Sequence, residues 1–189
     1  MSIDLCGVFS NRPDAYGLTR ARDAGIETQC IEHGHYETRE KFDQAVAEAI
    51  APWEPELLVL AGFMRILTPE FVARFSERLM NVHPSLLPLY PGLHTHQRAL
   101  DNGDSHAGAT VHYVTGELDG GPPVLQAKVP VNSGDDADAL AARVLAVEHQ
   151  IYPVAVNWHL CGRLTWGNDG LLKDGTPLPP TGELWENAS

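Results

Sequence analysis

Apolar and polar positions along the chain follow two periods, one typical of strands and one typical of helices. Short apolar runs predict strands over 3–9, 27–31, 56–61, 79–83, 107–115 and 124–131. Helical spacing and helix-entry residues predict helices over 14–24, 38–50 and 68–76, and a longer one from about 135. Because the two kinds of element alternate, the sequence predicts an α/β fold with a mostly parallel Rossmann-like sheet and helices on both faces.

Three of these elements carry further expectations. The run 57–60, Leu-Leu-Val-Leu, predicts a strand covered on both faces, and Asn11 is a candidate cap for the first helix. The long helix presents one continuous apolar face, made by Ala137, Leu140, Val144, Val147, Ile151, Val154 and Trp158. From Gly162 onward we expect short hairpin-like pieces, with a loosely ordered tail after about 170, and the whole of 1–189 as one domain.

Composition and charge narrow the class of protein. The 189 residues are 43% hydrophobic and carry 13 Lys plus Arg against 25 Asp plus Glu, a net charge of −12. Such a surface repels phosphate backbones and anionic lipid, so nucleic acid is not an expected partner. No apolar stretch is long enough to span a membrane, and the three cysteines form no C-x-x-C pair, so we expect a cytoplasmic protein.

The triplet Asn81-Val82-His83 is the most informative chemical pattern. Residues two apart in a strand face the same side, roughly 6.5 to 7 Å apart. An amide N–H can stabilise a developing oxyanion and an imidazolium can donate a proton to it, which suits addition to a carbonyl followed by collapse. The alternative for Asn81 and His83 is a strand-end amide bonded to its own backbone beside a structural histidine.

Two acidic residues are candidates for the same site. Asp119 lies in a glycine-flanked turn and is either a turn former or, if it lies beside His83, a group that raises the pKa of that imidazole. Glu148 lies on the flank of the buried face of the long helix, where it either reaches a cleft or is partly exposed on the surface.

For the remaining histidines and Arg39, the sequence favours a structural or surface role over a role in chemistry. His94 and His96 could suggest a metal pair, but no further ligand stands at metal-site spacing, so no metal is expected. His112 and His149 are interpreted as packing or surface histidines, and Arg39 as a solvated cation. Neither a Walker A loop nor a G-x-G-x-x-G loop occurs in the sequence.

Four segments in register resemble the phosphoribosylglycinamide formyltransferase family. They are LAGFMRIL at 60–67, NVHPSLLP at 81–88, YPGLHTH at 90–96 and ELDGG at 117–121. The similarity begins at Val8 and continues to about Pro180, so it covers nearly the whole chain. It implies the formyltransferase fold and a reaction in which the amine of glycinamide ribonucleotide takes the formyl group of 10-formyltetrahydrofolate.

The resemblance also implies roles for individual residues. Asn81 would hold the formyl oxygen, His83 would donate the proton, and Asp119 would raise the pKa of His83. Glu148 and Pro84 would contact the ribonucleotide. The implied folate-binding residues are Arg39, Met64, Arg65, Ile66, Leu67, Asn81, Val114, Thr115, Gly116, Glu117, Leu118 and Asp119. The expected partners are therefore small molecules, with no metal, nucleic acid or membrane, and the expected assembly is a monomer or homodimer.

One departure from the family pattern concerns the amino terminus. In the family an initial βα unit carries a phosphate-binding loop, and here Met1 stands directly before the counterpart of the second strand. We therefore expect folate to bind more tightly than the ribonucleotide. The departure is compatible with a later start than in the family, a rearranged or oligomer-completed sheet, or a non-catalytic folate-binding paralogue. A formyltetrahydrofolate hydrolase is the alternative enzyme, whereas a methionyl-tRNA formyltransferase would need a further tRNA-binding domain.

Overall fold

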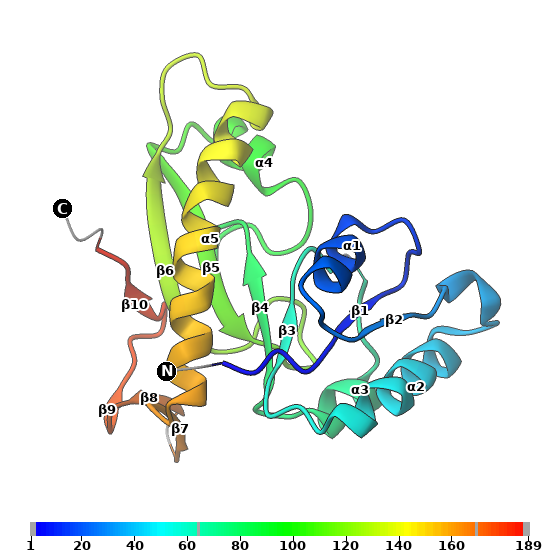
Figure 1. Ribbon diagram of the computed structural model, residues 1–189. Coiled ribbons are helices and arrows are strands. Elements are labelled where there is room, and N and C mark those ends of the chain that lie inside the picture. Colours follow the sequence, from blue (N-terminus) through cyan, green and yellow to red (C-terminus); the bar gives the residue numbers. More distant parts are fainter. Residues whose placement is uncertain (1–2, 64, 169, 187–189) are drawn as a thin grey trace. The chain divides into compact units, whose positions relative to one another are not determined.

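The computed structural model describes residues 3–63, 65–168 and 170–186 (Figure 1). Within these limits the chain forms two compact units. The first consists of residues 3–56 and 65–74, and the second of residues 57–63 and the described residues from 75 onward. Among the described residues no helix is both long and apolar enough to cross a bilayer.

The first unit contains a small parallel sheet and several helices. Strand β1 (Val8–Ser10) pairs in parallel with β2 (Thr28–Cys30). The helices are α1 (Tyr16–Asp23), η1 (His33–His35), α2 (Arg39–Ile50), η2 (Ala51–Trp53) and α3 (Pro69–Arg74). The predicted helices over 14–24, 38–50 and 68–76 are thereby confirmed within a few residues.

Two predictions for the beginning of the chain are wrong. The first strand spans only three residues, and Ile3 and Leu5 are 45% and 54% exposed rather than buried. Ala15, not Asn11, occupies the N-cap position of α1, and the Asn11 amide instead contacts Nδ1 of His33 at 3.1 Å. A polar residue near a helix start therefore found a side-chain partner in another element rather than the helix backbone.

Helix α2 is fixed at its start by a cap and at its middle by a buried carboxylate. The Thr38 hydroxyl accepts a hydrogen bond from the Lys41 backbone N–H, as expected of a threonine N-cap. Asp43 is buried, and its carboxylate accepts the Thr68 N–H at 2.7 Å. Because this N–H lies at the start of α3, Asp43 ties the two helices together.

The second unit is built on a five-stranded sheet with the order β10-β6-β5-β4-β3. Its strands are β3 (Leu58–Leu60), β4 (Leu79–His83), β5 (His106–Tyr113), β6 (Pro123–Pro130) and β10 (Glu183–Leu184). The pairs β3–β4 and β10–β6 are parallel, whereas β5 runs antiparallel to both β4 and β6. Four of the five strands therefore share one direction, which confirms the predicted mostly parallel α/β sheet.

Helix α5 (Ala137–Leu160) lies along β5 and β6 and covers that part of the sheet (Figure 1). Leu140, Val144 and Ile151 have no exposed surface, so the predicted apolar face is confirmed at its centre. The helix continues through Pro153. The sequence did not predict helix α4 (Thr95–Asp101), which packs near the beginning of α5.

The segment after α5 forms short strands. An antiparallel sheet is formed by β7 (Leu164–Gly167), β8 (Gly170–Lys173) and β9 (Thr176–Pro177). This agrees with the short hairpin-like pieces that the sequence predicts after Gly162. Strand β10 then pairs in parallel with β6. The final described segment is thereby hydrogen bonded to the five-stranded sheet.

The predicted cover on both faces of the third strand is not found. Val59 is 45% exposed, and Leu58 and Leu60 are only half-buried. Strand β3 forms the edge of the five-stranded sheet among the described residues, so it has one neighbouring strand rather than two. An apolar run therefore indicated the strand correctly but not its burial.

A buried hydroxyl stabilises this edge. The Tyr152 hydroxyl on α5 lies 2.8 Å from the carbonyl oxygens of both Leu60 and Met80, on β3 and β4. We expect Tyr152→Phe to lower the free energy of unfolding by about 1–2 kcal/mol, because the two carbonyls lose the single hydroxyl proton that they share. Tyr16→Phe is the matched control, since Tyr16 is 75% exposed. Urea unfolding measures both changes, and equal losses in the two variants would contradict the assignment.

Candidate active site

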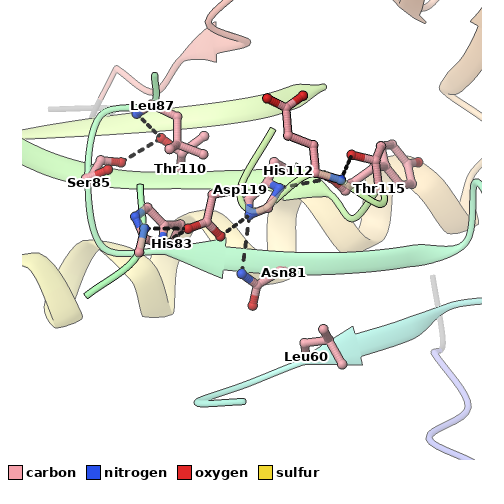
Figure 2. Close-up of polar contacts among 12 residues, drawn as sticks. Leu60, Asn81, His83, Ser85, Leu87, Thr110, His112, Thr115 and Asp119 are labelled. Atoms are coloured by element: carbon pink, nitrogen blue, oxygen red, sulfur yellow. Dashed lines mark hydrogen bonds and ion pairs between the residues drawn. The ribbon is translucent and has the colours of Figure 1, made fainter. Parts of the chain in front are cut away.

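Strand β4 ends in the pair that the sequence singles out. Asn81 and His83 are two residues apart on this strand, so their side chains project from the same face (Figure 2). Asn81 is half-buried and His83 is 5% exposed. The strand therefore places an amide and an imidazole together in a largely dry environment.

Both ring nitrogens of His83 have partners. Nε2 lies 2.9 Å from the carbonyl oxygen of Tyr90, which can only accept, so Nε2 carries a proton. Nδ1 faces Asp119 Oδ2 at 3.4 Å. The proximity of Asp119 to His83 that the functional interpretation requires is thus present in the structure.

The Asp119 side chain is held in a tight turn after β5. Its backbone has a φ of 50°, and its Oδ2 atom accepts the Gly92 N–H at 2.8 Å. The turn closes because position 121 is glycine: a Cβ there would lie 1.8 Å from the Tyr113 carbonyl oxygen. The carboxylate is only 11% exposed, and so it faces the site rather than solvent.

His112 is a fourth member of this cluster, and its interpretation as an ordinary packing or surface histidine is incomplete. It lies on β5 directly opposite Asn81 and is 2% exposed. Its Nε2 atom lies 3.3 Å from the Asn81 amide nitrogen and 3.8 Å from Asp119 Oδ1. Burial lowers the pKa of this imidazole. Only the antiparallel register of β4 and β5 brings it there, and the sequence does not reveal that register.

Hydrogen bonds from β5 and β6 fix the loop that follows β4. The Thr110 hydroxyl donates to the Ser85 carbonyl at 2.7 Å and accepts the Leu87 N–H at 3.0 Å. The Gln126 amide donates to the Leu87 carbonyl at 2.7 Å. Because this loop continues to Tyr90, the network positions the carbonyl that binds His83.

Two of the expected substrate-binding residues lie in the second unit. Pro84 directly follows His83 and lines a small cavity with Ser85 and His96. Glu148 is half-buried on α5, and burial raises the pKa of its carboxyl group to about 7. The contact of both residues with the ribonucleotide stays a prediction.

The expected folate-binding residues fall into two groups. Val114, Thr115, Gly116, Glu117, Leu118 and Asp119 form the turn after β5, where the Leu118 side chain is 56% exposed and the Thr115 hydroxyl accepts the Glu117 N–H. Arg39, Arg65, Ile66 and Leu67 belong to the first unit. Met64 lies outside the described residues.

Within the first unit, the expected folate residues have distinct surroundings. Arg39 begins α2 and is exposed. The Arg65 guanidinium stacks over the Phe42 ring at 5.1 Å, and Ile66 is 59% exposed. An exposed isoleucine beside a fixed cation is compatible with an aromatic ligand, but the assignment remains a prediction.

The two histidines of the YPGLHTH segment lie at the beginning of helix α4. His94 adopts a left-handed conformation at the N-cap position of α4, with a φ of 60°. Burial lowers the pKa of His96, whose Nδ1 atom is buried. Among the described residues, no three or more His, Cys, Asp or Glu side chains are grouped so as to hold a metal ion.

Comparisons with known proteins agree on one family. The formyl transferase profile matches residues 1–156. Phosphoribosylglycinamide formyltransferase of Escherichia coli (strain K12) is 53% identical over 175 residues, which cover 93% of this chain and 82% of the relative. The Haemophilus influenzae protein of the same name is 43% identical with the same coverage. The solved phosphoribosylglycinamide formyltransferase of Coxiella burnetii superposes with a TM-score of 0.92 at 44% identity, covering 97% of this chain and 87% of that one.

The raised pKa of Glu148 makes stability depend on pH. Between the ordinary value of 4.5 and about 7, the folded protein holds a proton that the unfolded chain has released. The free energy of unfolding therefore decreases as pH rises through this range. We expect Glu148→Gln to remove the decrease, so that the variant becomes more stable than the parent by on the order of 1–2 kcal/mol above the folded pKa.

Urea unfolding over this pH range measures the effect, with the exposed Glu186→Gln as the matched control. An unchanged pH dependence in Glu148→Gln would show that another group is responsible.

Proposed function

Because the chain belongs to the formyl transferase family, we propose that it transfers the formyl group of 10-formyltetrahydrofolate to the amine of glycinamide ribonucleotide. The products are formylglycinamide ribonucleotide and tetrahydrofolate, in purine biosynthesis. The observation that carries the proposal is the convergence of Asn81, His83 and Asp119, in a chain 53% identical to a phosphoribosylglycinamide formyltransferase.

Asn81 acts on the formyl oxygen in this proposal. Attack of the substrate amine on the formyl carbon forms a carbon–nitrogen bond and moves an electron pair onto the oxygen. An amide N–H already in place stabilises that charge without reorganisation, and its effect increases in a site from which water is largely excluded. Asn81 itself is half-buried on β4, and the His83 and His112 rings on either side of this position are 5% and 2% exposed.

His83 supplies and receives protons at Nδ1. Nε2–H is committed to the Tyr90 carbonyl, so the exchangeable proton of the imidazolium is the one on Nδ1, beside Asp119. The Asp119 carboxylate faces this nitrogen at 3.4 Å. Collapse of the tetrahedral intermediate breaks the bond from carbon to the folate nitrogen, which takes a proton while the attacking amine loses one.

The two substrates would contact different residues around this chemical centre. The turn 114–119 offers backbone groups and the exposed Leu118 side chain to the folate. Glu148 and Pro84 contact the ribonucleotide. No metal takes part, so a chelator leaves the rate unchanged, and both ligands are small molecules.

The first test is formyl transfer by the chain itself, followed by the absorbance of the folate product. The proposal requires consumption of formyl folate that depends on glycinamide ribonucleotide. Release of formate without the amine would instead indicate a hydrolase, and folate binding without turnover would indicate a binding protein.

The role of His83 gives a sharper prediction. We expect His83→Ala to lower kcat by about 10²–10⁴, because the transfer loses its general acid. The matched control is His149→Ala, since His149 is exposed on α5. Steady-state rates measure both. A His83→Ala rate close to that of the control would remove His83 from this role.

A further inference from the structure

His112 has no role in the transfer as described above, yet it lies against two of the three residues that do. It is nearly fully buried, and its Nε2 atom faces both the Asn81 amide nitrogen and Asp119 Oδ1 (Figure 2). Resting on the proposed function, we propose that His112 is a positioning residue that turns the Asn81 amide so that its NH2 group faces the formyl oxygen.

The tautomer of His112 is fixed by a backbone carbonyl. Nδ1 lies 2.9 Å from the Tyr113 carbonyl oxygen, which can only accept a hydrogen bond. Nδ1 therefore carries the proton of the neutral ring, and Nε2 is left as an acceptor. Burial lowers the pKa of the ring and so favours this neutral form.

An acceptor at Nε2 determines which end of the Asn81 amide can face it. The NH2 group donates one of its two protons to Nε2 at 3.3 Å and keeps the other for a ligand. In the flipped orientation the amide oxygen would face the Nε2 lone pair, and two acceptors would oppose each other. His112 thereby excludes the orientation that would present an oxygen to the developing oxyanion.

The two charged neighbours of His112 act in opposite directions: Asp119 raises the pKa of the ring and His83 lowers it, and burial, the largest effect, leaves that pKa lowered. Asp119 Oδ1 lies 3.8 Å from Nε2, beyond hydrogen-bond distance, while Oδ2 bonds the Gly92 N–H and faces His83. Asp119 is therefore engaged with His83, and the amide of Asn81 is the direct hydrogen-bond partner of Nε2.

Substitution at position 112 tests the proposal. We expect His112→Leu to lower kcat by about 10- to 100-fold with KM for formyl folate changed less than about threefold, since the amide stays but loses its orientation. His112→Gln should recover the rate to within a few-fold, because its side-chain oxygen can take the place of Nε2 as an acceptor. Loss of activity without rescue by glutamine would overturn the proposal.

A double-mutant cycle separates positioning from an independent effect. In an Asn81→Ala background, His112→Leu should change kcat by less than about twofold, because the group it orients is absent. If the two losses multiply, His112 acts by another route and the proposal is wrong. Thermal unfolding of each variant identifies losses that arise from misfolding.

A spectroscopic arm does not depend on turnover. Long-range proton–nitrogen spectra of the parent should report the Nδ1–H tautomer of His112, and the Asn81 side-chain amide signal, assigned with Asn81→Asp, should shift in His112→Gln. An Nε2–H tautomer would overturn the proposal. A parent without formyl transfer contradicts the proposed function, and these spectra then still decide whether His112 orients Asn81.

Discussion

The Asp119 carboxylate is the group on which the geometry of the site depends. Oδ2 accepts the Gly92 N–H and faces the His83 ring, while Oδ1 faces the His112 ring. A carboxylate that is only 11% exposed must be compensated, here by the Gly92 N–H and the His83 ring, since an unpaired buried charge is strongly destabilising. The turn after β5 and the loop after β4 are thereby fixed relative to each other. The close approach at position 121, which only glycine permits, belongs to the same constraint.

The scaffold around this carboxylate is well buried. Strands β4, β5 and β6 present Met80, Val111 and Leu125 with no exposed surface, and α5 covers β5 and β6 with residues equally buried. Groups mounted on such packed strands keep their geometry better than groups on free loops. The loop residues that complete the site gain comparable support from the Thr110 and Gln126 network. In the function we propose, this rigid placement lets an amide and an imidazole act on a charge that exists only during the reaction.

Local patterns in the sequence predicted where helices and strands form better than they predicted how deeply each element is buried and which elements lie beside it. The helix from Arg39 to Ile50 and the strand from Leu79 to His83 were predicted because cap, period and apolar content agree there. The exposure of Val59 was not, because burial depends on which strand lies alongside. The pairing of Asn81 with His83 followed from strand alternation, and the position of Asp119 followed from the family resemblance. The position of His112 followed from neither, since it is set by the antiparallel register of two strands separated along the chain.

Two histidines in contact with one carboxylate acquire different properties from their second nitrogens. In His83, Nε2–H donates to the Tyr90 carbonyl, so Nδ1 faces the carboxylate. In His112, Nδ1–H donates to the Tyr113 carbonyl, so the lone pair of Nε2 faces the Asn81 amide and can accept a hydrogen bond from its NH2 group. In the function we propose, these opposite tautomeric constraints suit one ring to proton transfer and the other to hydrogen-bond acceptance. Backbone carbonyls, whose positions follow from the fold rather than from side-chain chemistry, make that distinction.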